Sequence, residues 1–161
     1  MAYLDYDLLS SCYDELYGDE QRRKYDRVDK LCGGITGVIL DAGCGTALLL
    51  NYLRTHNKDY YDFYVGVDIS LGMLKIAKAR KDSASDFILA DIHNLPFRDK
   101  CIDTTLSITV VHHLNHVRAL YELKRVTRAL IVITQRKGLD NRILEGKKIE
   151  FEKENIYVIK P

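Results

Sequence analysis

Three aspartates carry the clearest chemical signal in the sequence, because each of them follows a short apolar run. Asp41 follows residues 38–40, Asp68 follows residues 63–67, and Asp91 follows residues 87–90. Short apolar runs of this kind are typical of buried strands in a parallel sheet. Ligands of parallel sheets bind at the carboxyl ends of the strands. We therefore expect the three carboxylates at one edge of a sheet, where they could serve a common ligand.

A glycine turn follows the first of these strands, where residues 41–47 read DAGCGTA. Gly43 and Gly45 permit backbone angles and close approaches that a side chain would block, and Cys44 lies between them. A helix that begins near Thr46 would present unpaired N–H groups and the positive end of its dipole to the turn. The pattern favours a ligand site, although a tight turn without a ligand can have the same residues.

The second aspartate narrows the kind of ligand. An acid at the end of the second strand, in the same α/β unit as a glycine turn, is placed to accept both hydrogens of a ribose diol. Strand-end aspartates are common without any ligand, so Asp68 alone decides little. Three such acids beside one glycine turn are less common, and together they favour the ligand interpretation.

Strand and helix patterns alternate along the chain and would position these residues. The alternation predicts a parallel α/β sheet with right-handed crossovers, with a fourth strand over residues 102–111 and a fifth over residues 129–134. Residues 148–152 and 155–159 alternate between polar and apolar side chains, which predicts a C-terminal hairpin at one edge of the sheet.

About two helices are expected before the first strand. Apolar side chains from Leu9 to Tyr17 have helical spacing, Gly18 is expected to interrupt that helix, and a second helix should end near Gly33. The two helices could simply cover the sheet, or they could close over a site beside it. Further along, the side chains of Ser70 and Asn115 are expected to cap two more helices.

Composition bounds the function without selecting one. The 161 residues carry a net charge of +1, and the four cysteines are scattered without a Cys-x-x-Cys pair, so no metal site is suggested. We expect a reduced, cytoplasmic setting and no membrane span. Residues 124–161 hold ten Lys and Arg against five Asp and Glu. That end could face RNA, but a solvated surface explains it equally well.

Four segments resemble the motifs of class I S-adenosylmethionine-dependent methyltransferases. Residues 41–47 look like the first motif, and residues 65–77 (VGVDISLGMLKIA) and 90–97 (ADIHNLPF) are similar to the second and third. Residues 102–114 resemble the fourth strand and the segment after it. The resemblance spans roughly residues 37–135 and is closest to the group that includes the ubiquinone/menaquinone-biosynthesis enzymes.

The resemblance implies a Rossmann-like three-layer α/β sandwich and S-adenosyl-L-methionine as cofactor. The length of the chain favours one domain over residues 1–161, with residues 1–34 expected as helices that cover the site. Asp41 and the backbone of Gly43, Cys44 and Gly45 would hold the methionine end, and Asp68 would accept from the ribose. Many members have a third glycine where this chain has Ala47.

The remaining contacts that the resemblance implies are those to the adenine and to the reactive methyl group of the cofactor. Ile69 and Met73 would pack on the adenine face, and Asp91, with Ile92 beside it, would accept from the adenine amino group. Thr109 would line the floor near the methyl group.

The tyrosines of the N-terminal segment also resemble a feature of related enzymes, in which a tyrosine closes over the methionine moiety. Tyr13 and Tyr17 are the candidates here, and plain core packing explains them as well. Methyl transfer needs no metal and mainly requires proximity and alignment. A general base helps only when the acceptor must lose a proton. His112 and His113 are weak candidates for that base, and His93 is weaker still.

Two other classes of function stay open. A nicotinamide-dependent oxidoreductase would also use a glycine turn and a strand-end acid, but it usually shows a fuller Gly-x-Gly-x-x-Gly. A cofactor-binding subunit could require a partner for activity, since an exposed sheet edge can pair with an activating protein or with a second copy. The methyl acceptor could be RNA, a protein or a small molecule.

Overall fold

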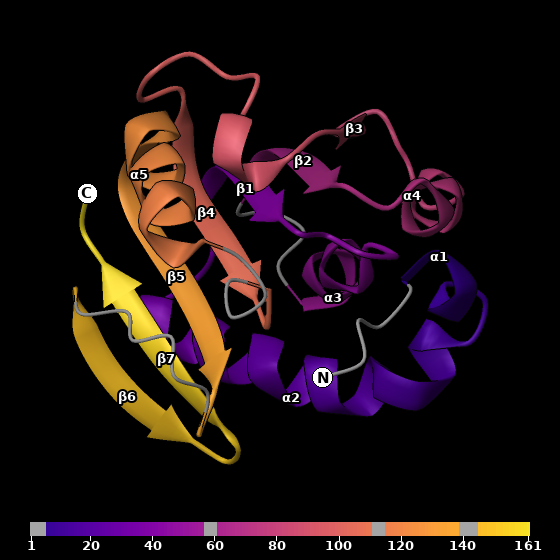
Figure 1. Ribbon diagram of the computed structural model, residues 1–161, viewed down its shortest axis with the longest axis horizontal. Coiled ribbons are helices and arrows are strands. Elements are labelled where there is room, and N and C mark those ends of the chain that lie inside the picture. Colours follow the sequence, from indigo (N-terminus) through magenta and orange to yellow (C-terminus); the bar gives the residue numbers. More distant parts are fainter. Residues whose placement is uncertain (1–5, 57–60, 111–114, 139–144) are drawn as a thin grey trace.

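The computed structural model describes residues 6–56, 61–110, 115–138 and 145–161. They form one sheet of seven strands in the order β3-β2-β1-β4-β5-β7-β6 (Figure 1). The strands are β1 (Gly37–Ala42), β2 (Tyr61–Asp68), β3 (Ser85–Leu89), β4 (Ile102–Ile108), β5 (Thr127–Arg136), β6 (Lys147–Phe151) and β7 (Glu154–Ile159). Strands β1 to β5 pair in parallel, and β7 runs antiparallel to β5 and β6. The predicted mostly parallel sheet with a C-terminal antiparallel hairpin is confirmed.

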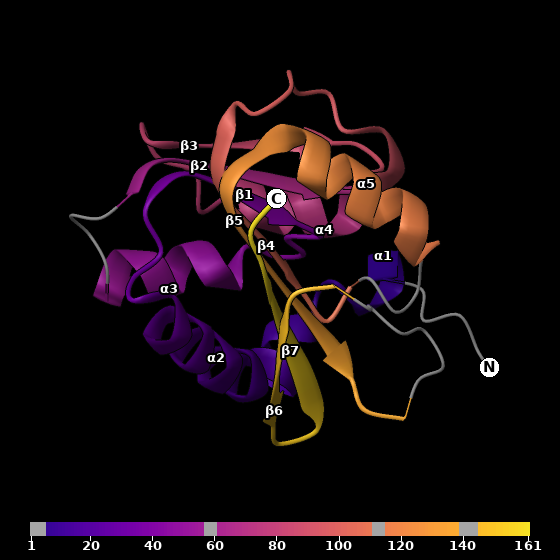
Figure 2. The same cartoon turned by 90° about the vertical axis from the view of Figure 1, so that its left-hand side faces the viewer.

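Helices cover both faces of the sheet and complete three layers (Figure 2). The helices α2 (Tyr13–Cys32), α3 (Leu48–His56) and α4 (Leu71–Lys78) pack on one face, and α5 (His116–Val126) and the 3₁₀-helix η1 (Ile92–Asn94) pack on the other. The short α1 (Tyr6–Leu9) lies against α4. Successive residues of a strand point to opposite faces, so Ile39 joins the first core and Leu40 the second.

The strand order reverses between β1 and β4. The chain builds β2 and β3 outward on one side of β1 and then crosses to place β4 on its other side. In open α/β sheets this reversal opens a crevice outside the carboxyl ends of the strands, where ligands bind. The glycine turn after β1 and Thr109 after β4 are the residues that the fold brings to this crevice.

The N-terminal helix differs from its prediction at Gly18, which does not interrupt it. Helix α2 runs unbroken from Tyr13 to Cys32, because an isolated glycine costs a helix only about 1 kcal/mol relative to alanine. That cost is offset by the burial of Tyr25 and Val28 in the core. The helix ends as predicted at Gly33, which has a left-handed φ of 70°.

Two other boundaries fall at residues with positive φ. Helix α3 begins at Leu48, later than predicted, because Ala47 has a φ of 64° that a helix cannot accommodate. Strand β4 ends at Ile108 instead of Val111, because Thr109 has a φ of 62°. Both residues lie at the crevice.

Two helix caps are confirmed, since Ser70 accepts from Met73 N and Asn115 accepts from Arg118 N. Within the described ranges no helix is both long enough and apolar enough to cross a membrane.

Candidate functional site at the carboxyl ends of β1, β2 and β4

The glycine turn after β1 is tied to β2 through its backbone. The N–H groups of Gly43 and Cys44 both donate to the carbonyl oxygen of Val67, at 2.8 and 3.0 Å. A side chain cannot replace the hydrogen of Gly43, whose φ is 86°, because a Cβ atom there would lie 2.5 Å from Cγ2 of Val110. The turn therefore needs glycine both for its conformation and for its close approach to the residues that follow β4.

Asp68 closes the turn from the end of β2. Its Oδ2 accepts from Gly45 N at 2.8 Å and its Oδ1 accepts from Ser70 N at 2.9 Å. Burial raises the pKa of this carboxyl, and the backbone N–H groups of Ser70, Gly45 and Ile69 oppose that rise. An ionised carboxylate has about four acceptor sites. Asp68 thus joins the glycine turn to the start of α4 and can still accept further hydrogen bonds.

These bonds engage the backbone N–H groups of the turn that the resemblance assigns to the methionine end of the cofactor. The N–H groups of Gly43, Cys44 and Gly45 all donate within the protein, because they hold the turn against β2. The first-turn N–H groups of α3, in contrast, have no partner inside the helix.

Asp41 is buried beside the turn, with 4% of its surface exposed. The Tyr64 hydroxyl donates to its Oδ2 at 2.5 Å. Burial raises the pKa of Asp41 to about 7, the hydrogen bond from Tyr64 lowers it, and the neighbouring Asp68 raises it. A buried carboxyl in such surroundings gains most from a cation placed next to it.

A small cavity of about 20 Å³ lies against Asp41 and the glycine turn. Its lining residues are Tyr13, Gln21, Tyr25, Asp41, Gly43, Cys44, Gly45, Thr46, Leu48 and Ile108. Tyr13 therefore lies beside the turn. Tyr17 is not part of this lining; its ring packs on Tyr13 with centroids 5.0 Å apart. Gln21 donates from Nε2 to the Tyr13 hydroxyl at 3.4 Å.

The N-terminal helices are fastened to both sides of the site. Asp7 accepts from Gly72 N at 2.8 Å and from the Ser70 hydroxyl at the start of α4. Asp14 accepts from the Thr46 hydroxyl at 2.5 Å and pairs with the guanidinium group of Arg80. These bonds join residues far apart in the sequence and fix α1 and α2 across the glycine turn.

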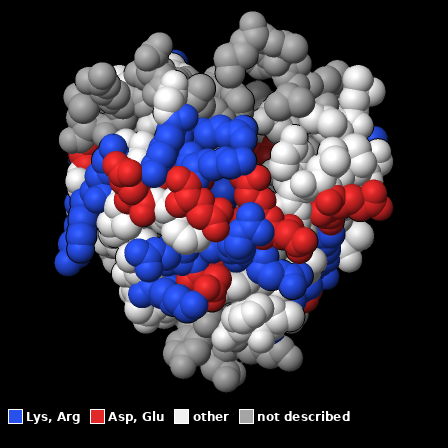
Figure 3. Space-filling model, turned by 90° about the horizontal axis from the view of Figure 1, so that it is seen from below, with Lys and Arg blue, Asp and Glu red and all other residues white. Residues whose placement is uncertain are grey.

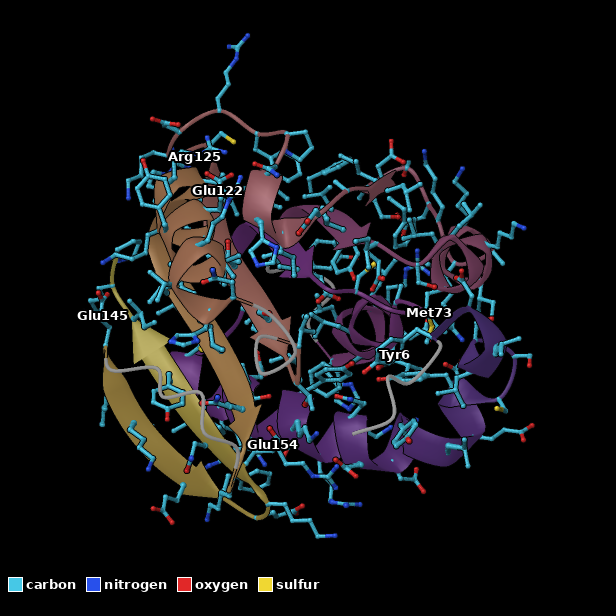
Figure 4. All side chains as sticks on the ribbon, viewed as in Figure 1. Tyr6, Met73, Glu122, Arg125, Glu145 and Glu154 are labelled. Carbon is cyan, nitrogen blue, oxygen red and sulfur yellow. The ribbon has the colours of Figure 1, made fainter. Side chains whose placement is uncertain are left out.

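The residues expected to contact the adenine differ in how far their side chains are exposed to solvent. Ile69 is 72% exposed, whereas Met73 and Ile92 are 2% and 6% exposed. Figure 4 shows Met73 close to Tyr6, where α1 meets α4. Asp91 caps η1, since its Oδ1 accepts from the backbone N–H of His93 at 2.9 Å and lies 2.8 Å from Nδ1 of the same residue. Ile69 thus offers an open apolar side chain, whereas Met73 and Ile92 are buried.

Thr109 at the end of β4 has a left-handed conformation and is hydrogen-bonded to two other segments, β5 and α2. Its N–H donates to the Thr134 hydroxyl at 2.9 Å, and its hydroxyl accepts from Lys24 Nζ at 2.8 Å. Lys24 is buried on α2 and pairs with Glu20 at 2.8 Å and with Glu154 at 3.1 Å. Figure 4 shows Glu154 at the start of β7, beside α2.

Sequence reasoning missed Gln21 and Lys24, although a signal for both was present. They lie on the helix face that also carries Tyr25 and Val28, where the spacing i, i+3, i+4 and i+7 marks the buried side. Both are buried in the structure, with 5% and 3% of their surface exposed. Polar side chains at apolar positions of an amphipathic helix are candidates for a site. The two candidate bases, His112 and His113, lie outside the described residues.

Comparison with known proteins identifies the class. The methyltransferase domain family matches residues 40–130. The malonyl-[acyl-carrier protein] O-methyltransferase of Pectobacterium atrosepticum is 36% identical over 122 residues, which cover 74% of this chain and 46% of that protein. A structure from Methanococcus maripaludis, described as an S-adenosyl-L-methionine-dependent methyltransferase, has a TM-score of 0.77 at 16% identity and covers 96% of this chain and 91% of its own.

A further structural neighbour comes from a complex of the Haloferax volcanii Trm112 methyltransferase activator with a methyltransferase. Its TM-score is 0.68 at 20% identity, over 84% of this chain and 62% of the other. The chain belongs to the methyltransferase domain family, in the class I S-adenosylmethionine-dependent group, and S-adenosylmethionine is the cofactor of that class. The chain spans less than half the length of the first curated relatives that it matches.

Proposed function

We propose that the protein transfers a methyl group from S-adenosylmethionine to an acceptor. The observation that carries the proposal is the buried carboxyl of Asp41, which faces a small cavity beside the glycine turn while Asp68 stands at the next strand end. The cofactor supplies an activated methyl group on a sulfonium centre. The residues of the chain bind it and align it, and no metal is needed for that task.

The described residues fit this cofactor part by part. Asp41 and the cavity would take the ammonium group of the methionine end, and Asp68 would accept from the ribose hydroxyls. Ile69 would cover one face of the adenine, supported by the buried Met73 and Ile92. Asp91 would accept from the adenine amino group, with one of its oxygens shared with His93. Thr109 would form the floor near the methyl group.

We further infer that residues 1–34 act as a cover of the cofactor within a single domain. The contacts of Asp7 with the start of α4 and of Asp14 with Thr46 and Arg80 support this interpretation. Hydrogen exchange tests it, because addition of S-adenosylhomocysteine should slow exchange in residues 6–20. Unchanged exchange there would contradict a role as a cover.

The acceptor is proposed only as a class, namely RNA, a protein or a small molecule. The basic excess of residues 124–161 gives RNA little support, because four of its ten cations form ion pairs of 3.0 Å or less with acidic side chains. The pairs are Lys124–Glu145, Arg125–Asp99, Arg128–Asp103 and Lys137–Glu150. Figure 3 shows Asp and Glu side chains interspersed with Lys and Arg on the face that it displays.

A second candidate is a cofactor-binding subunit that works with a partner. The neighbour solved with an activator favours it, and so does the C-terminal hairpin, in which β6 forms the last strand of the sheet. An unpaired strand edge can bind another chain or a second copy of this one. We also propose a reducing compartment such as the cytoplasm, since all four cysteines are free thiols.

Transfer of a labelled methyl group tests the proposed activity. The protein is incubated with methyl-labelled S-adenosylmethionine and cell extract, and the label is followed into RNA, protein and small molecules. We expect incorporation above that of the Asp68→Asn variant. Equal incorporation would contradict activity of the isolated chain. If incorporation of the label appears only after a co-purifying protein is added, the interpretation as a cofactor-binding subunit is favoured.

A further inference from the structure

The cavity between α2 and the glycine turn is the feature from which a further binding role can be inferred. Its volume of about 20 Å³ suffices for one group of the size of a water molecule, which requires roughly 10–15 Å³. An ammonium group has the same size and the same number of heavy atoms. The cavity is therefore of the right size for the charged nitrogen of an amino acid.

The groups that line the cavity are rich in oxygen and carry no positive charge. Besides Asp41, the lining residues that carry side-chain oxygen atoms include Gln21, Tyr13 and Tyr25. The ten lining residues, all of them described, include no Lys, Arg or His. Buried oxygen atoms are costly without a donor, and a buried carboxylate needs a counter-charge. The lining is thus complementary to a small cation with several N–H groups.

Gln21 has a carboxamide oxygen without a hydrogen-bond partner in this lining. The residue is 5% exposed, and among the residues that the structure describes none donates a hydrogen bond to its buried Oε1 atom. Its Nε2 atom donates to the Tyr13 hydroxyl, which fixes the amide so that Oε1 is left for another donor. A water molecule could satisfy Oε1, but it would give the ionised form of Asp41 no counter-charge.

We propose that Gln21 is a specificity residue that, together with Asp41, binds the α-ammonium group of the cofactor. The inference rests on the proposed function and adds to it a residue from α2, outside the matched family segment of residues 40–130. The N-terminal helix then contributes directly to recognition of the methionine end, beyond covering it. Ligands without an ammonium group gain nothing from Gln21.

Three ligands separate this role from a structural one. They are S-adenosylhomocysteine, its analogue with hydrogen in place of the amino group, and its analogue with hydrogen in place of the carboxylate. Calorimetry is carried out on the full chain and on Gln21→Met, which keeps the length of the side chain and removes the acceptor. We expect Gln21→Met to weaken both amino-bearing ligands roughly tenfold to a hundredfold, the usual effect of losing a hydrogen bond to a charged group. The desamino analogue should bind both proteins equally.

Two variants serve as controls. Gln21→Glu keeps an oxygen acceptor and should retain most of the affinity for the amino-bearing ligands. Lys24→Met removes a buried polar group of the same helix that does not line the cavity, and it should affect the three ligands in parallel. Parallel losses in Gln21→Met, or none, would overturn the inference. If the unaltered protein binds none of the three ligands, the proposed function itself fails and the role of Gln21 fails with it.

Discussion

Two aspartates at adjacent strand ends have different tasks because their surroundings differ. Asp41 is buried against a hydroxyl and a small cavity, whereas Asp68 is half-buried and bonded to the backbone of the turn and of α4. The first suits a cation and the second suits the hydroxyls of a sugar. Both positions could be predicted from the sequence, since each follows a strand-like run. Their hydrogen-bond partners could not, because those come from distant segments.

Substitution of Asp68 by asparagine tests the ribose assignment. The change keeps the size of the side chain and one oxygen but removes the charge and one acceptor. We expect the affinity for S-adenosylhomocysteine to fall at least tenfold, as for loss of a charge-assisted hydrogen bond. Calorimetry measures it, with Asp86→Asn on the exposed surface of β3 as the matched control. An unchanged affinity in Asp68→Asn would count against the assignment.

The pKa of Asp41 predicts how stability depends on pH. Burial raises this pKa from 3.8 to about 7 in the folded protein, so the folded state keeps a proton that the unfolded chain releases. The stabilisation from this proton is complete below the pKa of the unfolded chain and is lost as pH rises through the pKa of the folded state. Denaturant unfolding should show this fall in the free energy of unfolding from acidic pH to pH 7. Asp41→Asn should remove that component.

The same carboxyl predicts the pH dependence of binding. A cation binds to the ionised form of Asp41, whose fraction increases roughly tenfold between pH 6 and pH 8 for a pKa near 7. The affinity for S-adenosylhomocysteine should rise by about that factor over this range, and Asp41→Asn should bind weakly at every pH. A flat profile for the unaltered protein would show that Asp41 does not meet the ammonium group.

At the scale of elements, local rules gave the right helices and strands but some wrong boundaries. The caps at Ser70 and Asn115 and the stop at Gly33 follow from local chemistry and were predictable. The continuation of α2 through Gly18 depends on tertiary packing, which local propensity does not contain. The positive φ of Ala47 and Thr109 depends on the crevice between β1 and β4. The predictions of element boundaries were therefore wrong where tertiary packing or the crevice determines the backbone conformation.

Helix α2 offers a simple stability test at Gly18. A Cβ atom at this position would have no heavy atom within 4 Å, so Gly18→Ala should stabilise the protein by about 0.5–1 kcal/mol. For a chain of this size, that is a rise of roughly 1–4 °C in Tm. The matched control is Gly72→Ala in α4, where the new Cβ would lie 2.8 Å from Asp7 Oδ1. Melting followed by calorimetry should show no rise in Tm for Gly72→Ala. A fall in Tm for Gly18→Ala would contradict the inference that α2 accommodates alanine at this position without strain.

At the scale of the whole molecule, the fold class could be predicted from the sequence, but the complete order of the strands could not. Alternation of strands and helices was enough to predict the fold class, and polar alternation was enough for the C-terminal hairpin. Insertion of β7 between β5 and β6 is a non-local pairing that periodicity does not encode. The contributions of Gln21 and Lys24 likewise arise only when α2 folds back over the crevice.

The central claim is that this crevice binds S-adenosylmethionine, and calorimetry tests it most directly. The full chain is titrated with S-adenosylhomocysteine and, separately, with NADH at the same pH. The account predicts saturable binding of S-adenosylhomocysteine with one site per chain, and none of NADH. Binding of NADH alone would contradict it and would favour a nicotinamide-dependent oxidoreductase.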